Sequence, residues 1–405
     1  MSSIQYNTKK QQTKAQESTS IFRLLYDARV RGWIAQTLFL GIIVLVALYV
    51  TYNVNVNLAK SAVTTGFGFL SEPAGFDISQ TLIEYSSKST YADALLVGLL
   101  NTLLVSALGI VFSTILGFLL AVLRLSPNWL VARMAASYTE VIRNIPLLLQ
   151  ILFWYLAILT PLSGPRQAMS FFDVVYLCNR GLILSTPIFE EGCALFFIAI
   201  GVAVIVSMVL FYYNKKRQEL TGKRFPAFSL SLGLVIVLPY LALVITDFPV
   251  SWDIPVLKGF NFRGGVTVLP ELIALLAALT LYSATFVSEY VRSGIMSVDK
   301  GQREAAEALG YRPWIIYRLI IIPQALRVAI PPLISQYLTL VKNSSLAVVI
   351  GYPELVHVFA GTALNQSGQA MEIIAITMSI YLLISLVISG IMNVYNKKVV
   401  LRGSH

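Results

Sequence analysis

The stretch that decides the fold is GQREAAEALGYRPWIIYRLIIIP, residues 301–323, which is polar and charged although apolar sequence flanks it. Its pattern predicts two short helices joined by a turn. Asp299 is placed to cap the first helix, and Gln302 to complete a capping box. Gly310 supplies a left-handed stop, and Pro313 suits the first position of the next helix. Because a polar helix–turn–helix between two membrane spans must lie on one membrane face, a soluble partner can reach it.

The composition is that of an integral membrane protein. The 405 residues are 57% hydrophobic and 12% charged, with a mean hydropathy of +0.74, which lies outside the range of soluble domains. A helix needs about 20 apolar residues to cross a bilayer. Eight stretches are candidates, of which polar residues or proline interrupt the third, sixth and seventh: 33–52, 94–123, 142–161, 193–213, 227–247, 270–291, 326–350 and 370–395. We therefore predict an all-α integral membrane protein with about eight transmembrane helices.

Lysine and arginine set the orientation of these spans. If the N-terminus lies inside, the cytoplasmic segments hold 23 of the 30 Lys and Arg residues, and the external segments hold 6. This asymmetry places both termini and residues 301–323 in the cytoplasm. Topology thus accounts for the net charge of +10, and no nucleic-acid partner is expected. The basic loop 214–226 could bind anionic membrane lipid, although topology alone explains its charge.

The spacing within the polar stretch resembles a known motif. Glu304-Ala305-Ala306 is followed by Gly310 and then by Ile322-Pro323, which resembles the EAA loop of ABC-importer permeases, where the last pair is usually Leu-Pro. In that family the loop is the docking surface for the ATP-binding subunit. The alternative is an ordinary cytoplasmic loop with a helical patch. The resemblance implies a docking role for Gln302, Glu304, Ala305, Ala306, Gly310 and Pro323.

The resemblance extends over most of the chain. GLLNTLL, YTEVIRNIPLLLQ, SATFVSEYVRSGI, KGQREAAEALG, PQALRVAIPPL and KNSSLAVVIGYPEL resemble the five-span core of polar amino-acid permeases. The added first span and the insertion, with NRG at 179–181 and PIFEEG at 187–192, are similar to one of the two unlike permeases of general L-amino-acid ABC transporters. The resemblance predicts that the chain begins with a cytoplasmic tail (1–32) and an extra span with a periplasmic loop (33–93). The permease core then follows in two parts, 94–161 and 270–400, of which the second contains the EAA loop (293–325). An insertion with two spans (162–269) separates the two parts, and residues 401–405 are expected to be a tag remnant.

This resemblance implies a permease of the bacterial inner membrane that forms the translocation pathway of a binding-protein-dependent amino-acid importer. Two ATP-binding subunits, a second and different permease, and a periplasmic amino-acid-binding protein are the implied partners. ATP and Mg would sit on the ATP-binding subunit, with no cofactor on this chain.

Several enzymatic functions lack their motifs. The sequence has no G-x-x-x-x-G-K-[ST] phosphate-binding loop, since Gly222-Lys223 lacks the upstream glycine, so we expect no ATP hydrolysis by this chain. His357 and His405 are the only histidines, which argues against a His-based metal site. One alternative function is a self-sufficient ion-coupled secondary transporter, which would need inverted repeats and membrane-embedded acidic sites. Another is a membrane scaffold, which leaves the polar residues within the spans unexplained.

A zwitterionic substrate needs partners for its carboxylate and its ammonium group in a shielded cavity, and polar residues within spans are the candidates. The ammonium group could be received by Glu140 or Glu289, and the carboxylate by Lys342, hydroxyls and amides. Alternatively, Ser and Thr bond their own helices and each glutamate pairs with a nearby arginine. The candidate pathway residues are Asn101, Thr102, Glu140, Ser283, Thr285, Glu289, Gln336, Lys342, Asn343 and Ser344.

Two E-x-x-R pairs recur at cytoplasmic span ends, Glu140 with Arg143 and Glu289 with Arg292. The spacing places each pair on one helix face. They are candidates for gate or latch elements, or alternatively for ion pairs at the membrane boundary. On the outer side, Cys178 and Cys193 could form a disulfide, although two unpaired, packed cysteines are the favoured reading.

Overall fold

The computed structural model describes residues 28–61, 66–190, 192–222, 225–247 and 250–401. They belong to two compact units, Met1–Phe67 and Gly68–His405, which are taken separately below. Residues 1–27 of the predicted tail and residues 402–405 of the predicted tag remnant lie outside the described residues.

The first unit is built on one helix, α2 (Ala28–Ser61). Its segment Ala28–Val54 has a mean hydropathy of 2.3, and none of its most apolar stretch is buried within the chain. Thr51 satisfies its hydroxyl on its own helix, donating to the Ala47 carbonyl at 2.8 Å. A helix that is apolar all round suits contact with lipid, and α2 therefore agrees with the predicted first span.

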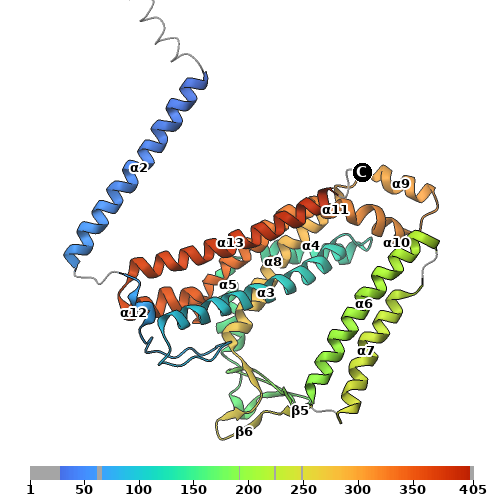
Figure 1. Cartoon of the computed structure of the whole chain (residues 1–405), viewed down its shortest axis with the longest axis horizontal. Coiled ribbons are helices and arrows are strands. Elements are labelled where there is room, and N and C mark those ends of the chain that lie inside the picture. Colours follow the sequence, from blue (N-terminus) through green and yellow to red (C-terminus); the bar gives the residue numbers. More distant parts are fainter. Residues whose placement is uncertain (1–27, 62–65, 191, 223–224, 248–249, 402–405) are drawn as a thin grey trace, which may run out of the picture. The chain divides into compact units, whose positions relative to one another are not determined.

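The membrane helices agree with the predicted number. Among the described residues, seven helices are long and apolar enough to span a bilayer, and a bent pair makes up to eight. Besides α2, five of them are single helices: α3 (Tyr91–Arg124), α6 (Cys193–Thr221), α7 (Ala227–Ile245), α8 (Pro270–Met296) and α13 (Ala370–Leu401) (Figure 1). The remaining one is continuous from α10 (Pro313–Ile316) through η4 (Tyr317–Ile321) and α11 (Ile322–Asn343) to η5 (Ser344–Ile350).

The predicted third span is the bent pair. Helix α4 (Trp129–Asn144) ends before Pro146, and α5 (Leu147–Leu152) with its continuation η2 (Phe153–Leu159) leaves at 100° to it. Proline cannot supply a backbone N–H, so the break would leave carbonyls of α4 without partners. The Gln150 side chain compensates, since its Nε2 donates to the carbonyls of Ile142 at 2.8 Å and Ile145 at 3.0 Å.

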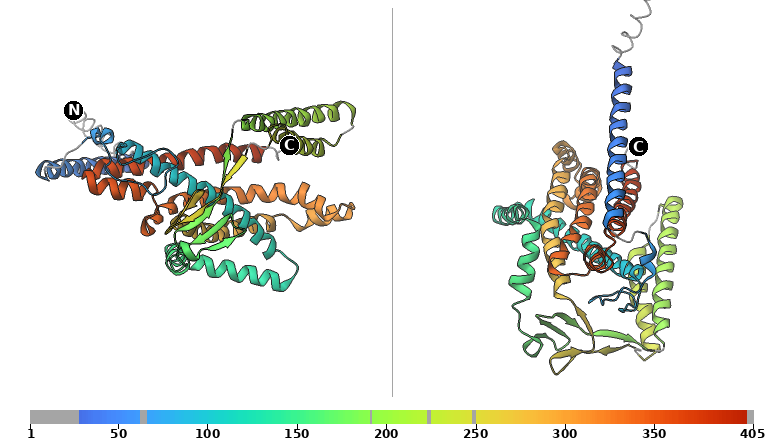
Figure 2. Two further views of the ribbon diagram at one scale, coloured as in Figure 1. Left: turned by 90° about the horizontal axis from the view of Figure 1, so that it is seen from below. Right: turned by 90° about the vertical axis from the view of Figure 1, so that its left-hand side faces the viewer.

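The insertion contains strands that the all-α prediction did not foresee. They form a four-stranded antiparallel sheet in the order β1-β2-β3-β8 and two two-stranded antiparallel sheets, β4 with β5 and β6 with β7. Figure 2 shows them gathered beside the start of α8. Their short apolar runs between turn residues were too brief to be recognised among much longer apolar spans. The strands are β1 (Met169–Phe171), β2 (Val175–Cys178), β3 (Gly181–Leu184), β4 (Thr186–Phe189), β5 (Val250–Asp253), β6 (Val256–Lys258), β7 (Asn261–Arg263) and β8 (Val266–Val268).

Close packing of α3 against α8 forms the centre of the second unit. Gly117 on α3 lies so close to α8 that an added Cβ would be 2.5 Å from the Val287 Cβ and 2.9 Å from the Ala284 carbonyl oxygen. Small residues allow such approach between membrane helices, where packing rather than the hydrophobic effect holds helices together. A buried apolar cluster that includes Val105, Leu275 and Leu279 continues this contact toward α5.

The two cysteines are free and buried, so the favoured alternative of unpaired, packed residues is confirmed. Cys178 ends β2 and Cys193 begins α6.

Candidate functional site

The predicted docking stretch contains a short helix, α9 (Lys300–Ala308). The Asp299 carboxylate caps it and accepts from the Gly301 N–H at 2.6 Å. Gln302 takes a different role from the predicted capping box, since its Oε1 accepts from Nε2 of Gln324 at 2.5 Å. This bond ties α9 to the first turn of α11.

One face of α9 is anchored to a small apolar cluster. Ala306 is 3% exposed and packs with Ile316 and Ile321, and Ile295 and Val298 cover the cluster from the end of α8. Ala306 is thus buried where α9 meets the end of α8 and the helix of α10 and η4.

The opposite face of α9 is exposed and includes Glu304 and Ala305. Arg303 and Glu307 form an ion pair at 2.8 Å on this helix, which raises the pKa of Arg303 above its ordinary value. At the end of α9, Gly310 has a φ of +75°, the left-handed conformation that the sequence predicts for a helix stop.

The second helix of the stretch is longer than predicted. It begins at Pro313 as expected, but α10 passes through the π-helical turn η4 into α11 without a break. Pro323 lies directly after η4, so the hydrogen-bond pattern of this helix changes close to the residue that has no N–H. The helix therefore begins 13 residues before the predicted span 326–350, which is about three and a half turns.

Large apolar side chains are exposed around the turn between the two helices. Leu309 is 76% exposed, Trp314 68% and Leu319 65%. Exposed apolar groups gathered in a charged segment are typical of an interaction site. We call Glu304, Ala305, Leu309, Trp314 and Leu319 the docking surface.

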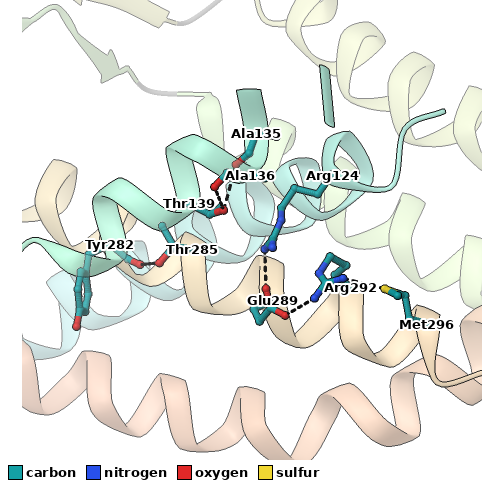
Figure 3. A network of polar contacts seen from close by, with 9 residues as sticks. All are labelled: Arg124, Ala135, Ala136, Thr139, Tyr282, Thr285, Glu289, Arg292 and Met296. Atoms are coloured by element: carbon teal, nitrogen blue, oxygen red, sulfur yellow. Dashed lines mark hydrogen bonds and ion pairs between the residues drawn. The ribbon is translucent and has the colours of Figure 1, made fainter. Parts of the chain in front are cut away.

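A cluster of ionic side chains joins the C-terminal parts of α3 and α8 (Figure 3). Glu289 accepts from Arg124 Nη1 at 2.7 Å and from Arg292 Nη2 at 2.6 Å. Arg292 also contacts the Met296 sulfur at 2.8 Å. The predicted Glu289–Arg292 pair is therefore present, but it has a third member, Arg124, that the E-x-x-R pattern did not reveal. The available signal was a lone arginine directly after the second predicted span, 94–123.

The second E-x-x-R pair is arranged differently. Glu140 and Arg143 are exposed on α4, and within the described part of the chain no ion pair joins them. The Arg143 guanidinium instead lies 5.9 Å from the ring centre of Phe286 on α8. The i, i+3 spacing permitted a pair, but an aromatic ring on a neighbouring helix offers the arginine another contact.

Asn101 and Thr102 hold the turn that follows α11. Asn101 is fully buried, and its Nδ2 donates to the carbonyls of Gln80 at 2.9 Å and Pro353 at 2.8 Å. Thr102 Oγ1 accepts from the Leu355 N–H at 3.0 Å and donates to the Gly98 carbonyl at 3.0 Å. Both side chains thus satisfy backbone groups of the chain itself.

Glu354 lies in this turn and was not among the predicted site residues. It is fully buried, and its carboxylate accepts from the Val356 N–H, the His357 N–H and the Tyr381 hydroxyl, at 2.8, 2.8 and 3.0 Å. It therefore caps the helix that follows. Burial raises the pKa of Glu354 to about 7, although these three donors oppose the shift. The available signal was an acidic residue in segment 351–369, which has no Lys or Arg and which the sequence predicts to be external.

The other predicted pathway residues are spread along α8 and α11. Thr285 and Ser344 bond their own helices, donating to the carbonyls of Tyr282 and Val341, each at 2.7 Å. Lys342 is exposed and Asn343 half-buried. Ser283 Oγ and Gln336 Nε2 are buried with no hydrogen-bond partner in the chain. The structure thus brings Asn101 and Thr102 together at one end and leaves Glu289 at the other.

We expect Glu354 to make stability depend on pH. Because burial raises its pKa from 4.5 to about 7, folding binds a proton, so this contribution is full below about pH 4.5 and is lost as pH rises through 7. His357 acts in the opposite sense, since burial lowers its pKa. The difference in melting temperature between the parent and Glu354→Gln should therefore change by a few degrees, roughly, between pH 5.5 and pH 8. A constant difference across this range would contradict the assignment.

Comparison with known proteins shows which protein family the chain belongs to. The family described as binding-protein-dependent transport system inner membrane component matches residues 113–401, which include the ionic cluster's Glu289, α9 and Glu354. The chain belongs to this family. It is thus a multi-pass permease component, as the EAA-like spacing indicated.

Three relatives align with this permease along almost its whole length, insertion included. YhdX of Escherichia coli, named as a candidate amino-acid ABC transporter permease, is 50% identical, with 91% of this chain and 94% of the relative covered. AapQ of Rhizobium johnstonii, a general L-amino acid transport system permease, is 48% identical, with 93% and 94% covered. BztB of Rhodobacter capsulatus, named for glutamate, glutamine, aspartate and asparagine transport, is 41% identical, with 94% and 96% covered.

Proposed function

We propose that this permease belongs to an ATP-driven, binding-protein-dependent importer of L-amino acids. The observation that carries the proposal is α9, a helix anchored through Ala306 that presents the docking surface outward in a chain of this family. Relatives named for amino-acid transport align over at least 91% of the chain, which supports the substrate class.

The partners follow from this arrangement. In our proposal α9 and both termini lie in the cytoplasm, where an ATP-binding subunit holds ATP and Mg and docks on the docking surface. Two such subunits sandwich ATP, and each requires a docking helix, so one copy of this chain needs a second permease. BztB and BztC of Rhodobacter capsulatus are two similar permeases whose names assign them to one transport system, which supports an unlike pair. A periplasmic amino-acid-binding protein supplies the substrate.

The experiment that tests the proposal is reconstitution. The chain is expressed with its neighbouring transport genes, purified from detergent, and placed in proteoliposomes with the co-purifying subunits. We expect amino-acid uptake that requires ATP and the binding protein, and co-purification of one ATP-binding subunit and one different permease. Uptake driven by an ion gradient without ATP would instead indicate a secondary transporter. Crosslinking that finds only self-pairs in an active transporter would contradict the unlike pair.

The substrate pathway remains a proposal, for which Gln336 is the best-supported residue. Its buried Nε2 lacks a partner in the chain. Asn101 Oδ1 and Ser283 Oγ lack one too, but Asn101 already holds a backbone carbonyl through its Nδ2, Thr102 accepts from a backbone amide, and Glu289 contacts two arginines. An unpaired amide within a membrane protein is costly and is therefore a candidate for contact with substrate or with the second permease.

We expect Gln336→Leu to change uptake or substrate preference by about tenfold, which corresponds to one lost hydrogen bond to a charged group. Basal ATP hydrolysis and assembly should persist. Asn101→Leu serves as the comparison, because losing its bonds to Gln80 and Pro353 should reduce stability rather than preference. The measurement is uptake of acidic, neutral and basic amino acids beside melting temperature. Parental uptake of all three classes by Gln336→Leu would place the pathway elsewhere.

A further inference from the structure

The ionic cluster of Arg124, Glu289 and Arg292 includes two residues from the last turns of α8, the helix that leads directly to α9. Three residues, Ser297 to Asp299, separate α8 from α9. These residues continue the turn of α8, since the Ser297 hydroxyl donates to the Gly294 carbonyl at 2.7 Å and the Val298 N–H to the Ile295 carbonyl at 3.4 Å.

Side-chain packing stabilises the junction between α8 and α9. Ile295 and Val298, at the end of α8, cover the same apolar cluster that buries Ala306 of α9. Gly294 lies against α11, where an added Cβ would be 2.6 Å from the Ala325 carbonyl oxygen. A displacement of α9 is therefore transmitted to the end of α8 and is not absorbed by a flexible linker.

The end of α8 is tied to α3 by charge. The side chains of Arg124 and Glu289 are only 12% and 25% exposed, so water screens their attraction less than it would on an open surface. Arg292 is on the same helix as Glu289 and cannot join α8 to anything else through this contact. Arg124 is thus the member of the cluster that connects two helices.

Helix α3 continues to the other side of the membrane protein. Near its beginning, Asn101 and Thr102 hold the turn at Pro353 and Leu355. The ion pair therefore lies between the docking helix and a helix whose far end positions a turn on the external side.

We propose that Arg124 is a positioning residue for coupling, which ties α3 through Glu289 to the end of α8 that carries α9. This role rests on the proposed function, because it matters only if an ATP-binding subunit moves α9. In this role the ion pair acts by holding two helices together. Its loss should separate ATP hydrolysis from transport while leaving the subunits assembled.

The test uses the reconstituted complex and measures substrate transported per ATP hydrolysed. We expect Arg124→Gln and Glu289→Gln to lower this ratio by about fivefold or more, a typical size for coupling between sites. The ATP-binding subunit should still co-purify. Arg133→Gln is the matched control, since it removes one exposed cytoplasmic-side arginine from α4 and should keep the parental ratio.

The charge exchange R124E/E289R supplies the decisive arm, because it restores one carboxylate–guanidinium pair between α3 and α8. We expect it to recover at least part of the ratio lost in either single variant. Parental coupling in Arg124→Gln would overturn the proposal, as would an exchange variant that is as uncoupled as the single variants although it assembles. Failure of the proposed function looks different, since the parent complex itself would then show no ATP-driven uptake.

Discussion

Gly117→Val is expected to be the most damaging single substitution in the transmembrane core. The added Cβ would lie 2.5 Å from the Val287 Cβ and 2.9 Å from the Ala284 carbonyl oxygen, distances that force α3 and α8 apart. Overpacking a core costs about 1–3 kcal/mol in ordinary cases, and here one of the obstructing atoms belongs to the backbone and cannot rotate away. We expect a lower yield of monodisperse protein and a clearly reduced melting temperature.

The control is Gly233→Val on α7, where an added Cβ meets nothing within 4 Å. Both substitutions add the same β-branched side chain to an apolar helix, so they differ in the packing environment alone. If Gly117→Val melted at the same temperature as Gly233→Val, the close α3–α8 contact would be wrong.

Ala306→Glu should abolish docking of the ATP-binding subunit. Ala306 is 3% exposed among Ile316 and Ile321, so a glutamate there either buries an unpaired charge or displaces α9. Burying an unpaired charge is strongly unfavourable, and the helix is therefore expected to leave its site. Membrane insertion should survive because α9 lies outside the predicted spans. Co-purification of the ATP-binding subunit and substrate-stimulated ATP hydrolysis should fall at least about tenfold, which corresponds to 1.4 kcal/mol.

Ala306→Ser is the matched control, since a small side chain still fits and carries no charge. Gly310→Val gives a second, independent disruption, because a β-branched residue is strained at a φ of +75°. Assembly and transport at the parental level in both Ala306→Glu and Gly310→Val would refute the docking role of this helix.

The ionic cluster and the docking helix together suggest how the two sides of the protein communicate. The docking helix is joined to α8 by packing, and α8 is joined to α3 by the Arg124–Glu289 ion pair. Because the packed interfaces have few alternative arrangements, a movement at α9 is expected to shift whole helices rather than single side chains. The charge-exchange experiment on Arg124 and Glu289 measures this connection directly.

Local sequence determined the membrane character, the number of spans and the short helix that we propose for docking. Apolar length alone separates a membrane helix from a soluble one, because about 20 apolar residues are needed to cross the bilayer. The docking helix was predictable for a similar reason. Asp299, Gly310 and Pro313 act through backbone geometry within a few residues of themselves, and the structure uses the three as the sequence indicates.

Contacts between segments far apart in the chain could not be predicted from local sequence. Gln302 was expected to cap its own helix but bonds Gln324, and Arg143 was expected to pair with Glu140 but lies over Phe286. In each case a side chain had a possible partner within its own helix, and a neighbouring helix supplied another one.

Glu289 and Glu354 show most clearly the difference between what local sequence predicts and what only tertiary contacts reveal. Glu289 was visible as half of an E-x-x-R pair, yet only the fold brings Arg124 to it from 165 positions earlier in the chain. Glu354 carried no local signal beyond its charge. Two of its hydrogen-bond donors are backbone amides close to it in sequence, but the third is the hydroxyl of Tyr381, which lies 27 residues away. The sequence alone shows which charged residues lie near the membrane spans. Only tertiary packing decides which of them form ion pairs and hydrogen bonds, because it brings together side chains that are far apart in the chain.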